Sequence, residues 1–345
     1  MKICHVNLAR GFRGGERQTQ LLIEQLAERG LEQSLVCRDD SPLRHALHGV
    51  QALTFVAAAQ MWQGHRRTPT ADLVHAHEAR AAHWSWWHTR LAHKPWLLTR
   101  RVPQAVKNKR FNRLVYQSAA TAVAISSPIE AHLRQRDWCP VTRIPSALAG
   151  FTTNQTVVET LRHRFAGHRV VGHIGALVDR HKGQRLIIET ARRLADSHPD
   201  MLFLMLGEGE DEQTLKAESA GLDNIVWEGF HDNLGDYLAV MDLFVFPSRH
   251  EGLGSTLLDV MNAGVPIIAS RVDGIPDIVH DDDSGVLIAP DNADALVDAV
   301  TALAADPERA ARLVAGARSR LADYSPAAMA EAYLALYERI VAESR

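Results

Sequence analysis

The sequence predicts an α/β protein with two domains, each built on a doubly wound parallel sheet. Short apolar runs rich in β-branched residues alternate with longer stretches of helical period along the chain. A length of 345 residues suits two domains of ordinary size. The charge also divides near residue 150: residues 1–150 hold 21 Lys and Arg against 10 Asp and Glu, and the remainder holds 17 against 31. The division predicts two domains with different partners.

The predicted strands form two series. The first comprises Ile3–Asn7, Ser34–Cys37, Ala52–Val56, Leu73–His75, Trp96–Thr99, Thr121–Ala124 and Val141–Ile144. The second comprises Val170–Ile174, Leu202–Leu206, Ile225–Trp227, Leu243–Phe246, Pro266–Ala269 and Val286–Ile288. The first part of the stretch 145–169 has no clean period and is the predicted linker. From Ala293 onward the pattern is helical, with breaks at Pro307 and Pro326.

Composition restricts the compartment and the partners. No apolar run is long enough for a membrane span and the first residues lack a signal-peptide pattern, so we expect a cytoplasmic protein. The three cysteines are widely spaced and indicate neither a disulfide framework nor a metal site. The basic half would suit an acidic substrate, an anionic membrane surface or nucleic acid. The alternative is that opposite charges only help the halves to dock.

Ligands of open parallel sheets bind beyond the carboxyl ends of the strands, so the residues that follow each strand are the candidates. Gly14 and Gly15 follow the first strand and precede a helix predicted to begin near Glu16, where backbone amides could approach a phosphate. A plain turn is the alternative, and the missing dinucleotide glycines disfavour a dehydrogenase. Arg180 and Lys182 follow Val170–Ile174 at a helix start, which favours a diphosphate clamp over a solvated loop.

The stretch "PSRHEGLGSTLLDVMNAGVPIIAS" follows the strand Leu243–Phe246. Glu251 lies in a loop with two glycines, Ser255 is a predicted helix cap, and Asp259 falls on the second helical turn. Two carboxylates near free backbone amides can hold a polyol and an anion. A glycosidase pair and an ordinary loop with a capped helix remain alternatives.

Together these residues resemble glycosyltransferase family 4, the retaining, nucleotide-sugar-dependent enzymes of GT-B fold. The resemblance spans nearly the whole chain and includes "LVHAH", "AISSPIEAHL", "GALVDRHKGQ", "LMLGEGED" and the long motif above. It implies two Rossmann-like domains facing across a cleft. Residues 1–150 would bind the acceptor, residues 151–325 would bind the donor, and a helix over 326–345 would return to pack on the N-terminal domain.

The resemblance also assigns roles around the donor sugar. Glu251 matches the first acid of the E-x7-E motif, which binds sugar hydroxyls. Gly252, Leu253, Gly254 and Ser255 match the loop whose amides meet the sugar and the diphosphate. Asp259 matches the acid that holds the ribose, where the family usually has Glu.

Further matches concern the diphosphate and the base. Lys182 matches the diphosphate lysine, while the position of its usual arginine partner is Ala176, so Arg180 is the candidate replacement. Gly15, next to Gly14, matches the glycine that closes over the diphosphate. Phe230 matches the region that meets the nucleobase through its backbone.

A basic segment, "RRVPQAVKNKRFNRLVYQS", follows the strand Trp96–Thr99 and is the candidate acceptor or membrane side. A helix predicted from near Gln104 would place Lys109, Arg110 and Arg113 on one side, and Arg100 and Arg101 would add to this basic surface. It would attract a phosphorylated acceptor or an anionic headgroup, although an ordinary solvated helix face is equally compatible. His77 is the histidine nearest a strand's carboxyl end and is predicted at the cleft. We expect no metal, because the histidines form no closed ligand set, and no nucleic acid, because no such binding motif is present.

The predicted activity is metal-independent transfer of a sugar from a nucleoside-diphosphate sugar, expected to be a UDP-sugar, with Lys182, Arg180 and Glu251 as catalytic residues. The expected acceptor is a glycan or glycolipid of the cell envelope, with lipopolysaccharide core as the first candidate. The enzyme would work at the inner face of the cytoplasmic membrane. Alternatives are a nucleotide-sugar epimerase of the same fold and a non-catalytic sugar- or nucleotide-binding module; a glycogen-type phosphorylase lacks support, because no cofactor-lysine motif is present.

Overall fold

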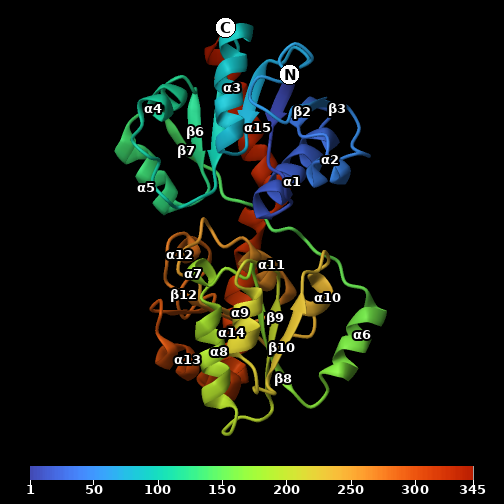
Figure 1. The fold of residues 1–345 in the computed structure, drawn as a ribbon, viewed down its shortest axis with the longest axis vertical. Helices are drawn as coiled ribbons and strands as arrows, with labels where there is room; N and C mark the ends of the chain where they lie inside the picture. The colour runs from blue at the N-terminus through green and yellow to red at the C-terminus, as the bar shows by residue number, and fades with distance from the viewer. Residues whose placement is uncertain (345) are drawn as a thin grey trace. The chain divides into compact units, whose positions relative to one another are not determined.

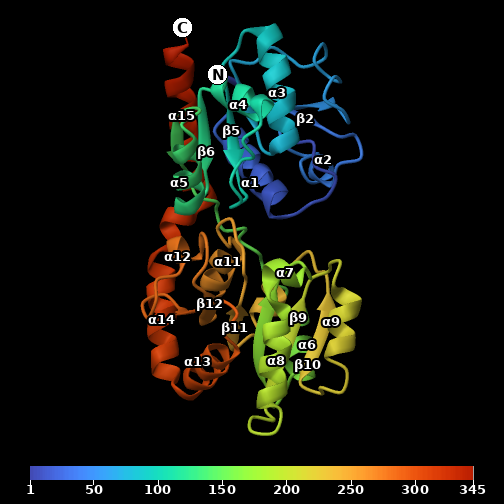
Figure 2. The same ribbon diagram turned by 60° about the vertical axis from the view of Figure 1, so that its left-hand side comes forward.

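The structure is a computed structural model that describes residues 1–344. The last residue of the predicted helix 326–345 therefore lies outside the described residues. The chain divides into two compact units, one of Met1–Ala149 with the segment from Asp323 onward and one of Gly150–Ala322. Figures 1 and 2 show the strands and helices of each.

Unit 1 is a parallel sheet covered by helices. Its strands are β1 (Lys2–Val6), β2 (Glu32–Cys37), β3 (Leu53–Ala57), β4 (Leu73–Ala76), β5 (Trp96–Arg100), β6 (Thr121–Ala124) and β7 (Val141–Arg143). Its helices are α1 (Gly14–Glu28), α2 (Pro42–Ala46), α3 (Ala79–Ala92), α4 (Arg110–Gln117), α5 (Ser127–Arg136) and α15 (Pro326–Glu343). The strand order is β3-β2-β1-β4-β5-β6-β7.

Unit 2 repeats this plan. Its strands are β8 (Arg169–Ile174), β9 (Met201–Leu206), β10 (Ile225–Gly229), β11 (Leu243–Phe246), β12 (Ile267–Ser270) and β13 (Val286–Ile288), in the order β10-β9-β8-β11-β12-β13. Its helices are α6 (Gln155–Arg164), α7 (Asp179–Lys182), α8 (Gln184–Leu194), α9 (Glu212–Glu218), α10 (Gly235–Leu238), α11 (Thr256–Ala263), α12 (Ile275–Ile278), α13 (Ala293–Ala305) and α14 (Pro307–Ser319). A short 3-10 turn, η1 (Leu321–Tyr324), precedes α15. The predicted α/β fold class is confirmed, and every predicted strand is present.

Each sheet is stabilised by a core of its own. In unit 1, α1 and α15 pack on the face of the sheet that presents Ile3, Leu73 and Leu97, and Tyr333 and Tyr337 bring α15 into this core. In unit 2, α8 and α13 contribute to one core with alternate residues of β9 and β11. Burial of these apolar side chains is the main stabilising term. Of the helices within residues 1–344, none is long and apolar enough to cross a bilayer.

The strand order reverses once in each sheet, between β1 and β4 in unit 1 and between β8 and β11 in unit 2. Connections leave in opposite directions at such a point, which opens a crevice beyond the carboxyl ends of the two strands. Lys182, at the end of the short helix α7 that follows β8, and Glu251, in the loop after β11, lie in these connections. The fold of unit 2 therefore places the two main sequence candidates at its switch point.

Candidate functional site

The loop after β8 is held against the loop after β11 by backbone contacts. Gly183 ends the short helix α7 at φ 68°, a conformation that favours glycine, and a Cβ there would collide with the carbonyl oxygen of Pro247. The amides of Arg249 and His250 donate to the carbonyl of His181 at 2.8 and 3.2 Å. The position of α7 is thus fixed by the residues that lead to the candidate acid.

Lys182 and Glu251 meet at this junction. The Lys182 ammonium forms an ion pair with Oε1 of Glu251, although the residues lie 69 positions apart in the chain. The Ser248 hydroxyl donates to the same carboxylate oxygen at 3.2 Å, and the Lys182 Nζ lies 5.1 Å from the ring centre of Phe246. The two side chains are 20% and 11% exposed, so both charges are partly desolvated yet accessible. Such a pair offers a cation for a phosphate and a carboxylate for hydroxyl groups.

Arg180 is placed differently from Lys182. Its guanidinium pairs with Glu210 at 2.5 Å and its side chain is 68% exposed. The carbonyl of Ala176, where the resemblance expects an arginine, accepts a hydrogen bond from Gln184 at 2.9 Å. The structure therefore brings Lys182 to Glu251 and leaves Arg180 on an exposed pair, and the catalytic role of Arg180 stays a prediction.

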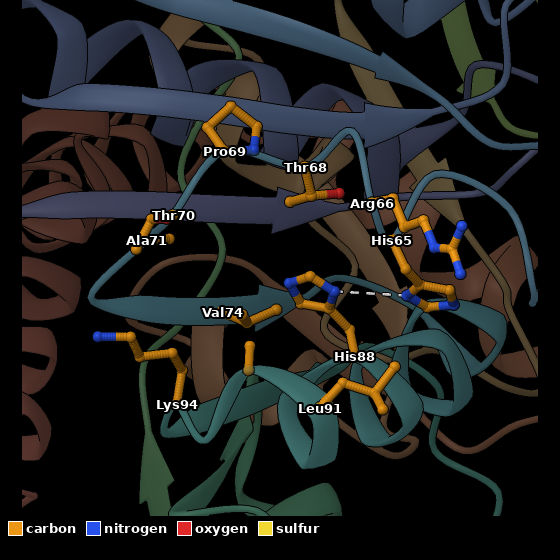
Figure 3. A pocket seen from close by; sticks show the side chains of 11 residues that line it. His65, Arg66, Thr68, Pro69, Thr70, Ala71, Val74, His88, Leu91 and Lys94 are labelled. Atoms are coloured by element: carbon orange, nitrogen blue, oxygen red, sulfur yellow. Dashed lines mark hydrogen bonds between the residues drawn. The ribbon is translucent and has the colours of Figure 1, made fainter.

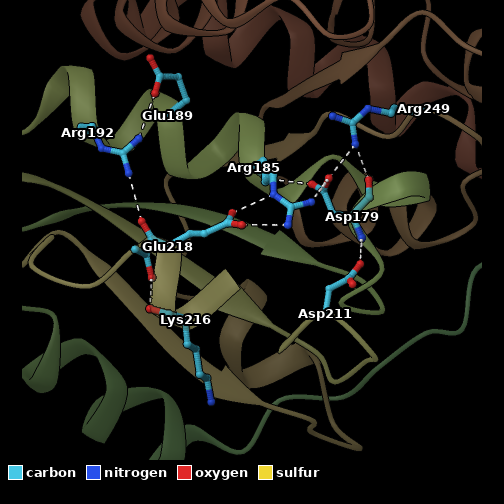
Figure 4. A network of polar contacts seen from close by, with 9 residues as sticks. Asp179, Arg185, Glu189, Arg192, Asp211, Lys216, Glu218 and Arg249 are labelled. Atoms are coloured by element: carbon cyan, nitrogen blue, oxygen red, sulfur yellow. Dashed lines mark hydrogen bonds and ion pairs between the residues drawn. The ribbon is translucent and has the colours of Figure 1, made fainter. Parts of the chain in front are cut away.

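A network of ion pairs around Asp179, at the start of α7, holds this short helix in place. The sequence analysis did not predict it. Asp179 is 5% exposed and accepts hydrogen bonds from the amide and the guanidinium of Arg185 at 2.8 and 2.9 Å. Arg249 adds a bond to the same carboxylate at 3.1 Å and one to the Asp179 carbonyl (Figure 4). Glu218 pairs with the other side of Arg185 (Figure 4). Only the position of Arg249, between the strand end and Glu251, could have signalled this role in the sequence.

Burial acts to raise the pKa of Asp179, but the hydrogen bonds from Arg185 and the charge of Arg249 outweigh it and hold this pKa below its ordinary value. The carboxylate is therefore ionised at neutral pH. The contacts between Asp179 and Arg249 tie the segment that carries Lys182 to the loop that carries Glu251. The network is a positioning device for the candidate pair.

The N-terminus of α11 is open to an anion. Gly254 has φ 80°, and within residues 1–344 the amides of Gly254, Ser255 and Thr256 have no hydrogen-bond acceptor. The prediction that Ser255 caps this helix is wrong: it occupies the N-cap position in a helical conformation, from which its side chain makes no cap bond. The uncapped amides carry the positive end of the helix dipole.

Asp259 lies in the first turn of α11, not in the second as predicted, because the helix begins at Thr256. Its side chain is 7% exposed, and Oδ1 accepts the amide of Gly150 at 3.0 Å. One carboxylate oxygen therefore holds the first residue of unit 2. The predicted ribose contact stays a prediction.

Phe230 directly follows β10 at the same carboxyl edge of the sheet. Its side chain is 57% exposed. An exposed aromatic residue beyond a strand's carboxyl end is compatible with the predicted nucleobase region, which stays a prediction.

In unit 1, α1 begins at Gly14, so the prediction of a start near Glu16 was wrong. The Glu16 carboxylate accepts a hydrogen bond from the amide of Arg13, the N-cap residue, at 2.9 Å. The helix therefore starts two residues earlier than predicted. Gly14 and Gly15 form the first turn of the helix. A Cβ on Gly15 would lie 3.5 Å from Cδ of Arg101, an ordinary contact. The predicted role of Gly15 stays a prediction.

Arg101 is half-buried, and its predicted place on a basic surface stays a prediction. Its guanidinium donates to the carbonyl of His77 at 3.0 Å, and its Nε is buried with no acceptor among the described residues. Burial lowers the pKa of Arg101. Arg100, in contrast, turns back to donate to the carbonyl of Gln104.

The predicted helix from Gln104 is also wrong, since α4 begins only at Arg110. The carbonyls of Gln104 and Val106 accept hydrogen bonds from arginine side chains and not from a following helical turn. The shorter helix still exposes Lys109, Arg110 and Arg113. Phe111 and Leu114 are exposed beside them at 38% and 53%.

His77 is buried within a histidine cluster that the sequence analysis did not assemble. Its Nε2 lies 3.0 Å from Nδ1 of His5, and His5 Nε2 donates to Gln33 at 3.0 Å. His75 lies opposite His5 in the β1–β4 register and bonds the Tyr337 hydroxyl at 2.6 Å. The register of two adjacent parallel strands was the available signal, because it places His5 beside His75.

The ligand atoms of His5, His75 and His77 lie within 4.8 Å of one another and form a possible donor set for a metal. Burial lowers the pKa of His5 to about 4 and those of His75 and His77 well below their ordinary value, so all three are neutral. Both ring nitrogens of His5 and of His75 already serve the hydrogen-bond network. The set fits a structural network better than a metal site, since a metal would have to replace these bonds.

We expect His173 to make the stability of unit 2 sensitive to acid. Its Nδ1 donates to the Val245 carbonyl at 3.0 Å, and burial lowers its pKa to about 4, against about 6.5 in an unfolded chain. The unfolded state therefore binds the proton first, and stability that is complete above about pH 6.5 is lost as the pH falls towards 4. The loss should be on the order of 3 kcal/mol. His173→Asn keeps the donor but not the titration, so urea unfolding should show a weaker pH dependence than in the wild type; equal dependence would contradict this role.

Known proteins with similar sequences are glycosyltransferases. Residues 168–306 match the family model described as glycosyl transferases group 1. The chain is 27% identical to the lipopolysaccharide core biosynthesis glycosyltransferase LpsE of Rhizobium meliloti, over 97% of this chain and 98% of that one. It is also 27% identical to LpsD of the same organism, over 99% of this chain and 100% of that one.

Among solved structures, Anabaena Alr3699/HepE in complex with UDP-glucose matches with a TM-score of 0.83 at 17% identity, over 98% of this chain and 100% of that chain. The match shows that the two share a fold. The chain therefore has the GT-B fold, and residues 168–306 carry a glycosyl transferases group 1 domain.

Proposed function

We propose that this glycosyltransferase moves a hexose from a UDP-sugar to an acceptor hydroxyl with retention at the anomeric carbon. The observation that carries the proposal is the pairing of Lys182 with Glu251 at the switch point of unit 2. The free amides from Gly254 to Thr256 lie in the same loop system as Glu251. In this proposal Lys182 and the amides bind the diphosphate, and Glu251 orients the sugar through its hydroxyls.

Lys182 and the α11 N-terminus would stabilise the charge that develops on the departing diphosphate. Pre-placed charges of this kind need no reorganisation when the bond breaks, and they act strongly because the site is partly desolvated. Glu251 leaves its pair with Lys182 when it accepts sugar hydroxyls, which frees the lysine for the phosphate. No metal is needed for these roles, because Lys182 supplies a positive charge.

The relatives support a particular donor and acceptor. HepE was solved with UDP-glucose, and LpsE and LpsD are named for lipopolysaccharide core biosynthesis. We propose by analogy a UDP-hexose donor and a lipopolysaccharide-core or related cell-envelope glycan as acceptor. Lys109, Arg110 and Arg113, with exposed Phe111 and Leu114 among them, would suit a phosphorylated acceptor or peripheral contact with the anionic inner face of the cytoplasmic membrane.

The proposal is tested with purified protein and a panel of UDP- and GDP-sugars. A thermal-shift screen should select a UDP-hexose, and transfer of that hexose to a lipopolysaccharide-core acceptor should give the same anomeric configuration as the donor by NMR. An inverted product would refute retention. Conversion of the donor alone to an epimer would favour the epimerase, and binding without transfer or hydrolysis would favour a non-catalytic module.

A further inference from the structure

Unit 1 holds a pocket that none of the proposed steps uses. It encloses about 340 Å³, within the usual range for small-molecule sites. Its walls come from the loop of residues 65–71, which leads into β4, and from the C-terminal end of α3 (Figure 3). Lys94, which precedes β5, closes one side. The pocket therefore lies at the amino ends of the strands, at the edge opposite to His77 and Arg100.

The lining of the pocket is positively charged. It contains Arg66 and Lys94, together with the hydroxyls of Thr68 and Thr70, and no carboxylate. Neither Arg66 nor Lys94 forms an ion pair or a side-chain hydrogen bond within residues 1–344. Figure 3 shows the two cations on opposite sides of the pocket. Unpaired cations around a concave surface attract an anionic group.

His88 provides a directed hydrogen-bond acceptor. His65 Nε2 lies 2.8 Å from the Met61 carbonyl, so this nitrogen carries a hydrogen, and the lone pair of His65 Nδ1 receives the hydrogen of His88 Nδ1 at 3.4 Å. Burial and the neighbouring His65 lower the pKa of His88 to about 4, so the ring is neutral. The other nitrogen, Nε2, is then an acceptor.

His88 is 9% exposed, and its Nε2 has no partner among the described residues. Figure 3 shows the ring in the middle of the pocket, with the contact to His65 on one side and the second nitrogen on the other. An acceptor nitrogen that opens into a pocket is suited to a hydrogen bond from a ligand hydroxyl. Leu91, 70% exposed, adds an apolar wall.

We propose that this pocket is a second ligand site, which binds a phosphorylated polyol: a hydroxyl donates to His88 Nε2, and the phosphate pairs with Arg66 or Lys94. The chemistry is shared by free sugar phosphates and by phosphorylated polyol headgroups of lipids. The site is distinct from the candidate donor site, which lies in unit 2. It does not depend on the proposed function.

The test is isothermal titration calorimetry of the full chain with glucose 6-phosphate, with inorganic phosphate and glucose as separate probes. Glucose 6-phosphate should bind more tightly than inorganic phosphate alone or glucose alone. His88→Asn keeps a donor towards His65 but removes the Nε2 acceptor, and should weaken binding about fivefold. Arg66→Gln or Lys94→Gln should weaken it about tenfold or more, whichever holds the phosphate. Arg67→Gln is the matched control, because Arg67 is adjacent but does not line the pocket.

A second arm identifies the source of the ligand. Vesicles of phosphatidylcholine that contain phosphatidylinositol are compared with phosphatidylcholine alone in a sedimentation assay. If binding of glucose 6-phosphate is weaker in the pocket variants but not in Arg67→Gln, the site takes a free sugar phosphate. If binding of the phosphatidylinositol vesicles is weakened in this way, the site takes a lipid headgroup. If Lys182→Ala binds these probes as tightly as the wild type, the pocket is separate from the candidate donor site. Absence of binding to both probes, or binding unchanged in all pocket variants, would overturn the proposal.

Discussion

Replacing Lys182 by alanine should lower the rate of sugar transfer by a factor of about 10²–10³, because it removes a cation aimed at the departing diphosphate. The loss should appear in kcat/KM measured with the UDP-hexose that the screen selects. Lys182→Arg should recover part of the rate, since it restores the charge with a different shape.

The matched control is Lys216→Ala, which removes an exposed lysine paired with Glu212 on α9 of the same unit. It should leave transfer and the thermal unfolding midpoint nearly unchanged, since an exposed pair contributes about 0.2–1 kcal/mol. Equal turnover in Lys182→Ala and the wild type would remove Lys182 from the mechanism. Circular dichroism of each variant separates a loss of chemistry from a loss of fold.

Asp179→Asn should lower the free energy of unfolding of unit 2 by about 3 kcal/mol, because it leaves Arg185 and Arg249 without their shared buried charge. Transfer should fall as well, since α7 carries Lys182 and is held by this carboxylate. Urea unfolding and kcat/KM measure the two effects.

The control is Asp294→Asn, which removes the charge from an aspartate that is 84% exposed and pairs with Arg193. It should cost less than about 1 kcal/mol and leave transfer unchanged. If Asp179→Asn behaved like this control, the network would be an ordinary surface feature and not a device that positions Lys182.

The sequence was sufficient for the fold because the fold depends on local patterns. Runs such as Leu243–Phe246 are short, apolar and followed by turn residues, so their identity as buried strands follows from period and composition. Pro307 and Pro326 mark helix starts for a similar local reason, since each occupies the first turn. The placement of Lys182 and Glu251 beyond the carboxyl ends of two strands followed from one topological rule for parallel sheets.

Tertiary contacts decided the features that the sequence did not predict. Arg101 looks like a surface cation, and only its hydrogen bond to the His77 carbonyl and its buried Nε show that it is half-buried. The late start of α4 is accompanied by side-chain hydrogen bonds to the preceding carbonyls, from Arg100 to Gln104 and from Arg136 of α5 to Val106. Contacts of this kind leave no periodic signal in a sequence.

The central claim is that the edge of unit 2 with Lys182 and Glu251 binds the diphosphate of the donor. Calorimetric titration of UDP and of uridine, into the wild type and into Lys182→Ala, tests it most directly. We expect UDP to bind the wild type at least about tenfold more tightly than uridine, and Lys182→Ala to lose most of that difference. Equal affinities for UDP and uridine in the wild type, or an unchanged difference in Lys182→Ala, would contradict the claim.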